Sequence, residues 1–107
     1  MNRNIPVSEQ WYHAARKWAD MNAAADMLEE GKSAYLSQRM AALGDMPVSK
    51  AELAVKASPD WSDYIKKMVR AREQSNLAKI EMEFLRMKFG EWNAADANNR
   101  QQMRMTA

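Results

Sequence analysis

Side chains that could carry chemistry are scarce. His13 is the only histidine among 107 residues and cysteine is absent, so one chain cannot assemble a His-based metal site or a Cys–His nucleophile. The carboxylate pairs Glu29–Glu30 and Glu81–Glu83 are one or two residues apart, and such positions do not share a helix face. Nucleotide-binding glycine loops and a G-x-S-x-G nucleophile turn are also missing. We therefore expect a protein that is not an enzyme and uses no metal or cofactor.

Basic residues form the more suggestive group. Arg72, Lys79 and Arg86 recur every seven residues, which places them in a row along one flank of a helix. Repeated around an oligomer, such rows could follow the phosphates of a nucleic acid. The alternative is a solvated flank, because Glu83 lies four residues from Lys79 and three from Arg86. The predicted nucleic-acid-binding residues are Lys66, Lys67, Arg70, Arg72, Lys79 and Arg86.

The elements that position these residues are predicted to be helices. The chain has ten methionines but three glycines and three prolines, and strand formers are rare, with three Ile, four Val and one Thr. No segment alternates polar and apolar residues as a half-buried strand does. We expect an all-α protein: a long antiparallel helical hairpin with a short capped helix in the connection, coiled-coil-like packing and self-association.

Capping signals set the predicted boundaries. Ser8 is the expected N-cap of a first helix over about 9–43, which ends before Gly44. Ser49 and Glu52 have the spacing of a capping box, with Val48 and Leu53 at the positions of a hydrophobic staple, and predict a short helix over about 50–57.

The third predicted helix begins with Ser58 as N-cap and Pro59 in its first position, and covers about 59–98. Residues 1–98 form one predicted domain, and 99–107 a polar flexible tail. Inside the first helix, Gly31 predicts either a kink or a close backbone contact.

The third helix has apolar residues on two opposite sides. One line alternates spacings of four and three, as the seam of a coiled coil does; we call it the inner seam, and it consists of Tyr64, Met68, Ala71, Ser75, Ala78, Met82, Leu85, Phe89 and Trp92. At about 100° per residue a second line falls nearly opposite. We call it the outer stripe, and it consists of Val69, Leu77, Ile80, Phe84 and Met87.

The first helix can cover the inner seam, but one partner cannot cover both sides. The outer stripe is therefore the predicted oligomer interface, where another copy of the chain would pack. The competing interpretation is a monomeric three-helix bundle, in which the short helix and the N-terminal arm fold over the stripe. Among the tryptophans, Trp11, Trp18 and Trp92 fall on seam positions and are expected in the core, whereas Trp61 is expected to be exposed.

Charge and compartment are weakly informative. The net charge is only +2, with 28% charged residues, so a basic surface must come from local arrangement and not from net excess. The start MNRNIPVSEQW lacks the apolar core of a signal peptide, and no stretch reaches the roughly 20 apolar residues of a membrane span. Together with the absence of cysteine, this predicts a cytoplasmic protein without a membrane partner.

The segment from Ser49 to Arg100 has a familiar composition. Its short helix, its aromatic and acidic start "PDWSDY" and its long helix with "SNLAKIEMEFL" resemble small helical proteins of bacteriophage recombination modules, and more distantly the UvsY-type recombination mediators of T-even phages. The resemblance implies a helical oligomer in the host cytoplasm that binds single-stranded DNA and helps a recombinase to load. No binding residue is carried over from it, and the first helix departs from it.

Two functions of different class follow. One is a recombination accessory that binds single-stranded nucleic acid. The other is a protein-interaction adaptor or inhibitor that docks a host or phage protein through an exposed, Met-rich apolar stripe.

Overall fold

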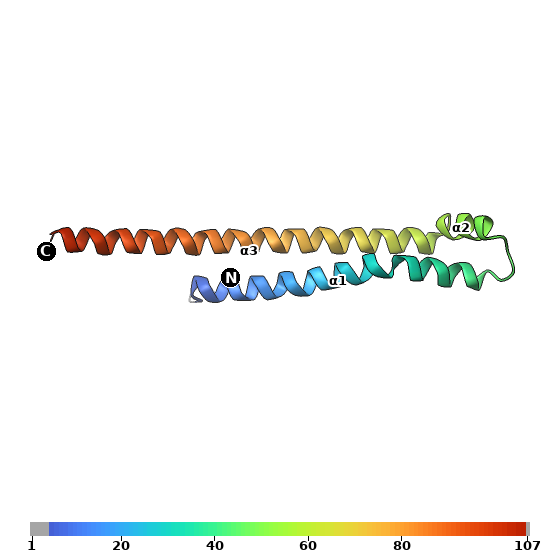
Figure 1. Ribbon diagram of the computed structural model, residues 1–107, viewed down its shortest axis with the longest axis horizontal. Helices are drawn as coiled ribbons and strands as arrows, with labels where there is room; N and C mark the ends of the chain where they lie inside the picture. Colours follow the sequence, from blue (N-terminus) through green and yellow to red (C-terminus); the bar gives the residue numbers. More distant parts are fainter. Residues whose placement is uncertain (1–4, 107) are drawn as a thin grey trace.

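The computed structural model describes residues 5–106, and it is helical almost throughout. Helix α1 spans Val7–Ala42, α2 spans Val48–Lys56 and α3 spans Pro59–Thr106. Figure 1 shows α1 and α3 side by side and antiparallel, with the short α2 at the end where the chain turns. The molecule is a rod with extents of 86 × 24 × 16 Å. The prediction of three helices without a strand is confirmed for residues 5–106.

The first two helices begin after prolines and not at the predicted serine caps. Pro6 and Pro47 are the N-cap residues, with extended ψ angles of 149° and 140°, and neither helix has a side-chain cap. The Pro6 carbonyl accepts hydrogen bonds from the N–H groups of residues 9 and 10, both at 3.0 Å. The predictions of Ser8 as a cap and of a Ser49 capping box are therefore wrong, because both serines already lie inside the helix.

The predicted staple around α2 is wrong as well. Val48 and Leu53 are 72% and 71% exposed, so they do not pack against each other. Glu52 accepts a hydrogen bond from Lys56 at 2.7 Å in place of the predicted capping contact. The face of α2 that packs against the hairpin carries Ala51 and Val55, both buried.

Two other boundary signals are confirmed. Gly44 has a φ of 83°, the left-handed conformation that ends many helices and that glycine adopts at little cost. The Ser58 hydroxyl accepts a hydrogen bond from the Trp61 N–H at 3.3 Å and donates one to the Val55 carbonyl at 2.6 Å. Ser58 thus links the end of α2 to the start of α3.

Helix α3 does not end near residue 98 as predicted. It continues to Thr106, and Arg100 pairs with Asp96 one turn earlier. After Pro59 at its start, α3 contains no further proline, and after Gly90 it contains no further glycine, so no residue interrupts the helix. In Figure 1 this last part of α3 extends beyond the start of α1.

The inner seam forms the contact between α1 and α3 and is built from small side chains at its centre. Ala25 of α1 and Ser75 and Ala78 of α3 are 0%, 1% and 3% exposed. Small residues at these positions let the two helices approach closely. Toward the open end, Ala14 and Leu85 are also buried.

Two tryptophans, Trp11 and Trp92, lie outside the core that the sequence predicted. Trp92 is 67% exposed and lies two turns beyond the buried Leu85. Trp11 is 38% exposed near the same end. Within residues 5–106, no helix combines the length and the apolar character needed to traverse a bilayer.

Candidate functional site on the outer surface of helix α3

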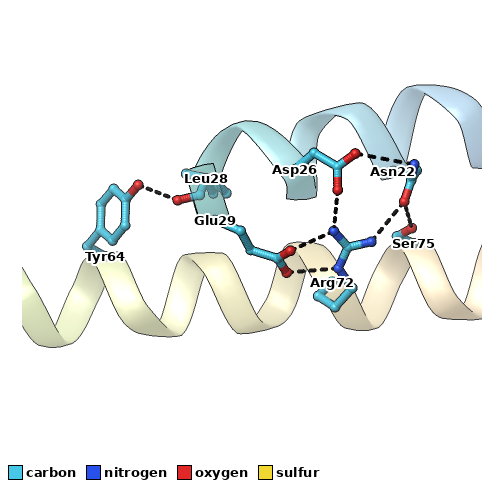
Figure 2. Close-up of polar contacts among 7 residues, drawn as sticks. All are labelled: Asn22, Asp26, Leu28, Glu29, Tyr64, Arg72 and Ser75. Atoms are coloured by element: carbon cyan, nitrogen blue, oxygen red, sulfur yellow. Dashed lines mark hydrogen bonds and ion pairs between the residues drawn. The ribbon is translucent and has the colours of Figure 1, made fainter. Parts of the chain in front are cut away.

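Arg72, predicted to bind nucleic acid, is held by the partner helix instead. Figure 2 shows its guanidinium enclosed by three side chains of α1. Nε and Nη2 donate to the two oxygens of Glu29, both at 2.8 Å. Nη2 also donates to Asp26 at 2.6 Å, and Nη1 donates to Asn22 at 2.8 Å. Most of the N–H groups of the Arg72 guanidinium are therefore hydrogen-bonded to α1 within the hairpin.

This cluster joins the polar flank of the hairpin to the buried seam. The Ser75 hydroxyl donates to the side-chain amide oxygen Oδ1 of Asn22 at 3.5 Å, and the amide nitrogen Nδ2 of Asn22 donates to the Asp26 carboxylate at 3.5 Å (Figure 2). Hydrogen bonds from Arg72 lower the pKa of the Glu29 carboxyl group, and hydrogen bonds to Glu29 and Asp26 raise the pKa of Arg72. The cluster therefore favours the charged forms of Glu29 and Arg72, and its hydrogen bonds fix the register between α1 and α3.

Sequence reasoning missed the α1 half of this cluster. Asn22, Asp26 and Glu29 recur at spacings of four and three, so they share one flank of α1. In an antiparallel helix pair, the residues that border the seam on one helix face the residues that border the seam on the other helix. The spacing was therefore a usable signal for a partner of Arg72.

A second contact point lies closer to the turn. The Tyr64 hydroxyl donates to the Leu28 carbonyl at 2.5 Å, and a Cβ on Gly31 would lie 3.3 Å from the same hydroxyl oxygen. The close contact predicted at Gly31 is thus confirmed. Tyr64 stacks on Tyr35 with ring centroids 4.4 Å apart. Trp61, predicted to be exposed, is half-buried and stacks on Tyr35 at 6.2 Å.

The outer stripe is uncovered along its whole length. Its members Val69, Leu77, Ile80, Phe84 and Met87 are between 57% and 63% exposed. An open hollow of about 490 Å³ lies against the stripe and is lined by Val69, Leu77 and Met68, with Arg72 at its edge. Helix α2 packs at the turn and does not reach the stripe, so within residues 5–106 it does not form the three-helix bundle of the competing interpretation.

Of the predicted cations other than Arg72, Lys66 and Arg70 lie on the side of the outer stripe. Lys79 and Arg86 continue the row of Arg72 along one flank of α3, and Lys67 lies on the other flank. Between residues 66 and 88, six exposed basic side chains have no ion pair, whereas Glu73 and Glu83 are the only carboxylates there without one. The other ionic groups of this stretch are used inside the hairpin, Arg72 with α1 and Glu81 with Lys17 at 3.8 Å. The six cations are Lys66, Lys67, Arg70, Lys79, Arg86 and Lys88.

The described residues contain no cluster that could hold a metal ion. His13 lies on the surface of α1 beside Glu9, at 3.6 Å, with both side chains more than half exposed. Among residues 5–106 no group of three His, Asp or Glu side chains comes close enough to hold a metal ion. What the surface of α3 presents is an apolar stripe flanked by unpaired cations, an arrangement suited to binding macromolecules.

Comparisons with protein-family models, curated proteins and solved structures found no match to this chain.

Proposed function

We propose that the protein is a non-enzymatic helical homo-oligomer that binds single-stranded nucleic acid on the outer surface of α3, as an accessory to recombination. The observation that carries the proposal is that α3 presents both an uncovered apolar stripe and exposed, unpaired cations, which lie beside the stripe and along the flanks of the helix. The stripe supports assembly and the cations support phosphate binding. The recombination role follows the resemblance of the second half of the chain to phage recombination proteins.

Assembly through the outer stripe is energetically reasonable. Each of its five side chains is a little more than half exposed, so covering it would contribute about 1 kcal/mol. Two copies would together gain on the order of 10 kcal/mol, which is comparable to the estimated 4–15 kcal/mol lost in translational and rotational freedom. We therefore expect association at micromolar and not nanomolar concentrations.

Binding to nucleic acid would rest mainly on phosphate contacts. A row of Lys and Arg with few groups that read base edges contacts the backbone, so binding should be insensitive to base sequence. Within residues 5–106 there is no recognition helix, arm or ribbon for a duplex groove, so single strands should be preferred. Assembly would repeat the same cations at high effective concentration and so raise the apparent affinity.

A labelled oligonucleotide titrated at several salt concentrations tests the proposal. Replacing Lys79 and Arg86 together by Ala should lower the slope of log affinity against log salt by about 1.4 for single strands, if each contacts one phosphate. Lys50→Ala is the matched control, because this exposed lysine lies on α2, away from the outer surface of α3. Arg72→Ala should leave the slope unchanged, because its guanidinium is occupied by α1. No binding at low salt would refute the nucleic-acid proposal.

The exposed stripe also favours the second candidate, a protein-interaction adaptor or inhibitor. Here another protein, and not a second copy, would cover Leu77 to Met87. A chain that is monomeric at tens of micromolar and does not bind oligonucleotides would lead to this function. Replacing Ile80 by Glu should then abolish binding to the identified partner, because the charge would be buried in an apolar contact.

A further inference from the structure

The outer stripe has the spacing of a second coiled-coil seam. Leu77, Ile80, Phe84 and Met87 follow one another at three, four and three residues, and all four are more than half exposed. The same line continues one step in each direction to Glu73 and Glu91, both exposed. The apolar part is thus about 15 Å long and is bounded at both ends by a carboxylate.

Three charged residues border this seam where the flanking positions of a coiled coil would lie, and one of them, Glu81 next to Ile80, is paired with Lys17 of α1. Glu83 immediately precedes Phe84, and Lys88 immediately follows Met87. Both side chains are exposed, and among residues 66–88 neither takes part in an ion pair. Each is therefore available to a second helix that packs on the seam.

Orientation decides what these two charges meet. In a parallel, in-register coiled coil, consider the residue that immediately precedes a core position on one helix. It lies next to the residue of the other helix whose number is five higher. Glu83 of each copy would then face Lys88 of the other, giving two ion pairs of opposite charge. In an antiparallel pair centred on the stripe, equivalent flanks meet, so Glu83 would face Glu83 of the other copy. Charge complementarity thus favours the parallel arrangement.

We propose that a second copy of this chain packs on the outer stripe in parallel and in register, with Glu83 and Lys88 paired across the contact. This inference rests on the proposed function, because it specifies the partner and geometry of the proposed assembly. The two α1 helices would lie on the outside of the pair. The free ends of both α3 helices would lie together at one end, and the α2 helices at the other (Figure 1).

Introduced cysteines can report the orientation, because the chain has none of its own. Glu73→Cys and Glu91→Cys place a thiol at either end of the seam, about 27 Å apart along α3. In the parallel pair, two copies of the same variant become linked by a disulfide. When the two variants are mixed, no disulfide joins a copy of one variant to a copy of the other. In the antiparallel pair neither variant links to itself, but the mixture links one to the other. Arg100→Cys is the control, since this exposed residue lies on the opposite side of α3 from Glu73 and Glu91 and should not cross-link in either case.

Charge reversal tests the ion pairs independently. Glu83→Lys and Lys88→Glu should each weaken dimerisation, by roughly three- to tenfold, because exposed ion pairs are individually weak. Mixing the two variants, or combining both changes in one chain, should restore the wild-type dissociation constant. If the mixture stays as weak as the single variants, the proposed pairing is wrong.

The outcomes also separate this inference from the proposed function. A wild-type chain that light scattering finds monomeric at tens of micromolar would refute the homo-oligomer and this geometry together. An oligomer that cross-links only in the mixture would refute the parallel orientation and leave the homo-oligomer standing. An oligomer in which neither cysteine cross-links would show that the copies meet on another surface.

Discussion

The contact between Gly31 and Tyr64 offers a sharp test of how α1 and α3 fit together. Replacing a glycine inside a helix by alanine ordinarily stabilises the helix by about 1 kcal/mol. At Gly31 the added Cβ would lie 3.3 Å from the Tyr64 hydroxyl oxygen, which is tighter than an ordinary contact. The Tyr64 ring stacks on Tyr35 and its hydroxyl donates to the Leu28 carbonyl, so it has little room to move away.

The expected magnitude follows from these opposing effects. A typical hydrogen bond contributes about 0.5–1.5 kcal/mol net, so displacing the hydroxyl should offset most of the gain in helix propensity. Gly31→Ala should therefore change the free energy of unfolding by less than about 0.5 kcal/mol. In a Tyr64→Phe chain the obstructing oxygen is absent, and the same substitution should stabilise the protein by about 1 kcal/mol.

Urea unfolding of the four chains, followed by circular dichroism at one fixed protein concentration, measures this coupling. The fixed concentration matters because self-association would add to the apparent stability. The coupling free energy between the two sites should be about 1 kcal/mol. Equal effects of Gly31→Ala with and without the Tyr64 hydroxyl would refute the close approach of the two helices at this point.

The remaining predictions concern capping, acid and the Arg72 cluster. Ser58→Ala should cost about 1 kcal/mol of unfolding free energy, whereas Ser49→Ala should cost less than about 0.5 kcal/mol, because only Ser58 caps a helix. The pKa of Glu29 is lowered from 4.5, so its carboxylate stabilises the fold above pH 4.5 and loses this effect as the pH falls through the lowered value. Thermal melts across this range should therefore show a smaller loss of stability for Glu29→Gln than for the wild type. Arg72→Met should lower the melting temperature more than Lys79→Met does, because Arg72, unlike Lys79, is hydrogen-bonded to α1.

The sequence predicted the features that depend on periodicity. Seven-residue spacing placed Ser75, Ala78 and Leu85 on the face that meets α1, and all three are buried. The same reasoning separated the outer stripe from the seam, because the side opposite a covered face is fixed by helix geometry alone. Periodicity is a property of one helix, so it can be read without knowing the partner.

Features that depend on competition between neighbours were predicted poorly. Ser8 and Ser49 have good capping chemistry, but the preceding prolines already have the extended ψ that an N-cap needs. The role of Arg72 depends on which residues of α1 lie opposite, and that register is a tertiary property. Trp92 was assigned to the core because the seam pattern continues to it, although α1 is too short to cover it.

The two-helix width of the rod has an energetic consequence. With extents of 86 × 24 × 16 Å, the molecule has no interior that all of its residues share. A side chain near the turn and one near the open end are too far apart to influence each other, so the free-energy effects of substituting them should add. The stability of the contact between α1 and α3 is then a sum of local contributions, in which each helical turn is stabilised by the turns next to it and local unfolding can begin at an end of the rod. Amide hydrogen exchange should be slowest at the centre, near Ala25 and Ser75, and fastest in the last turns of α3.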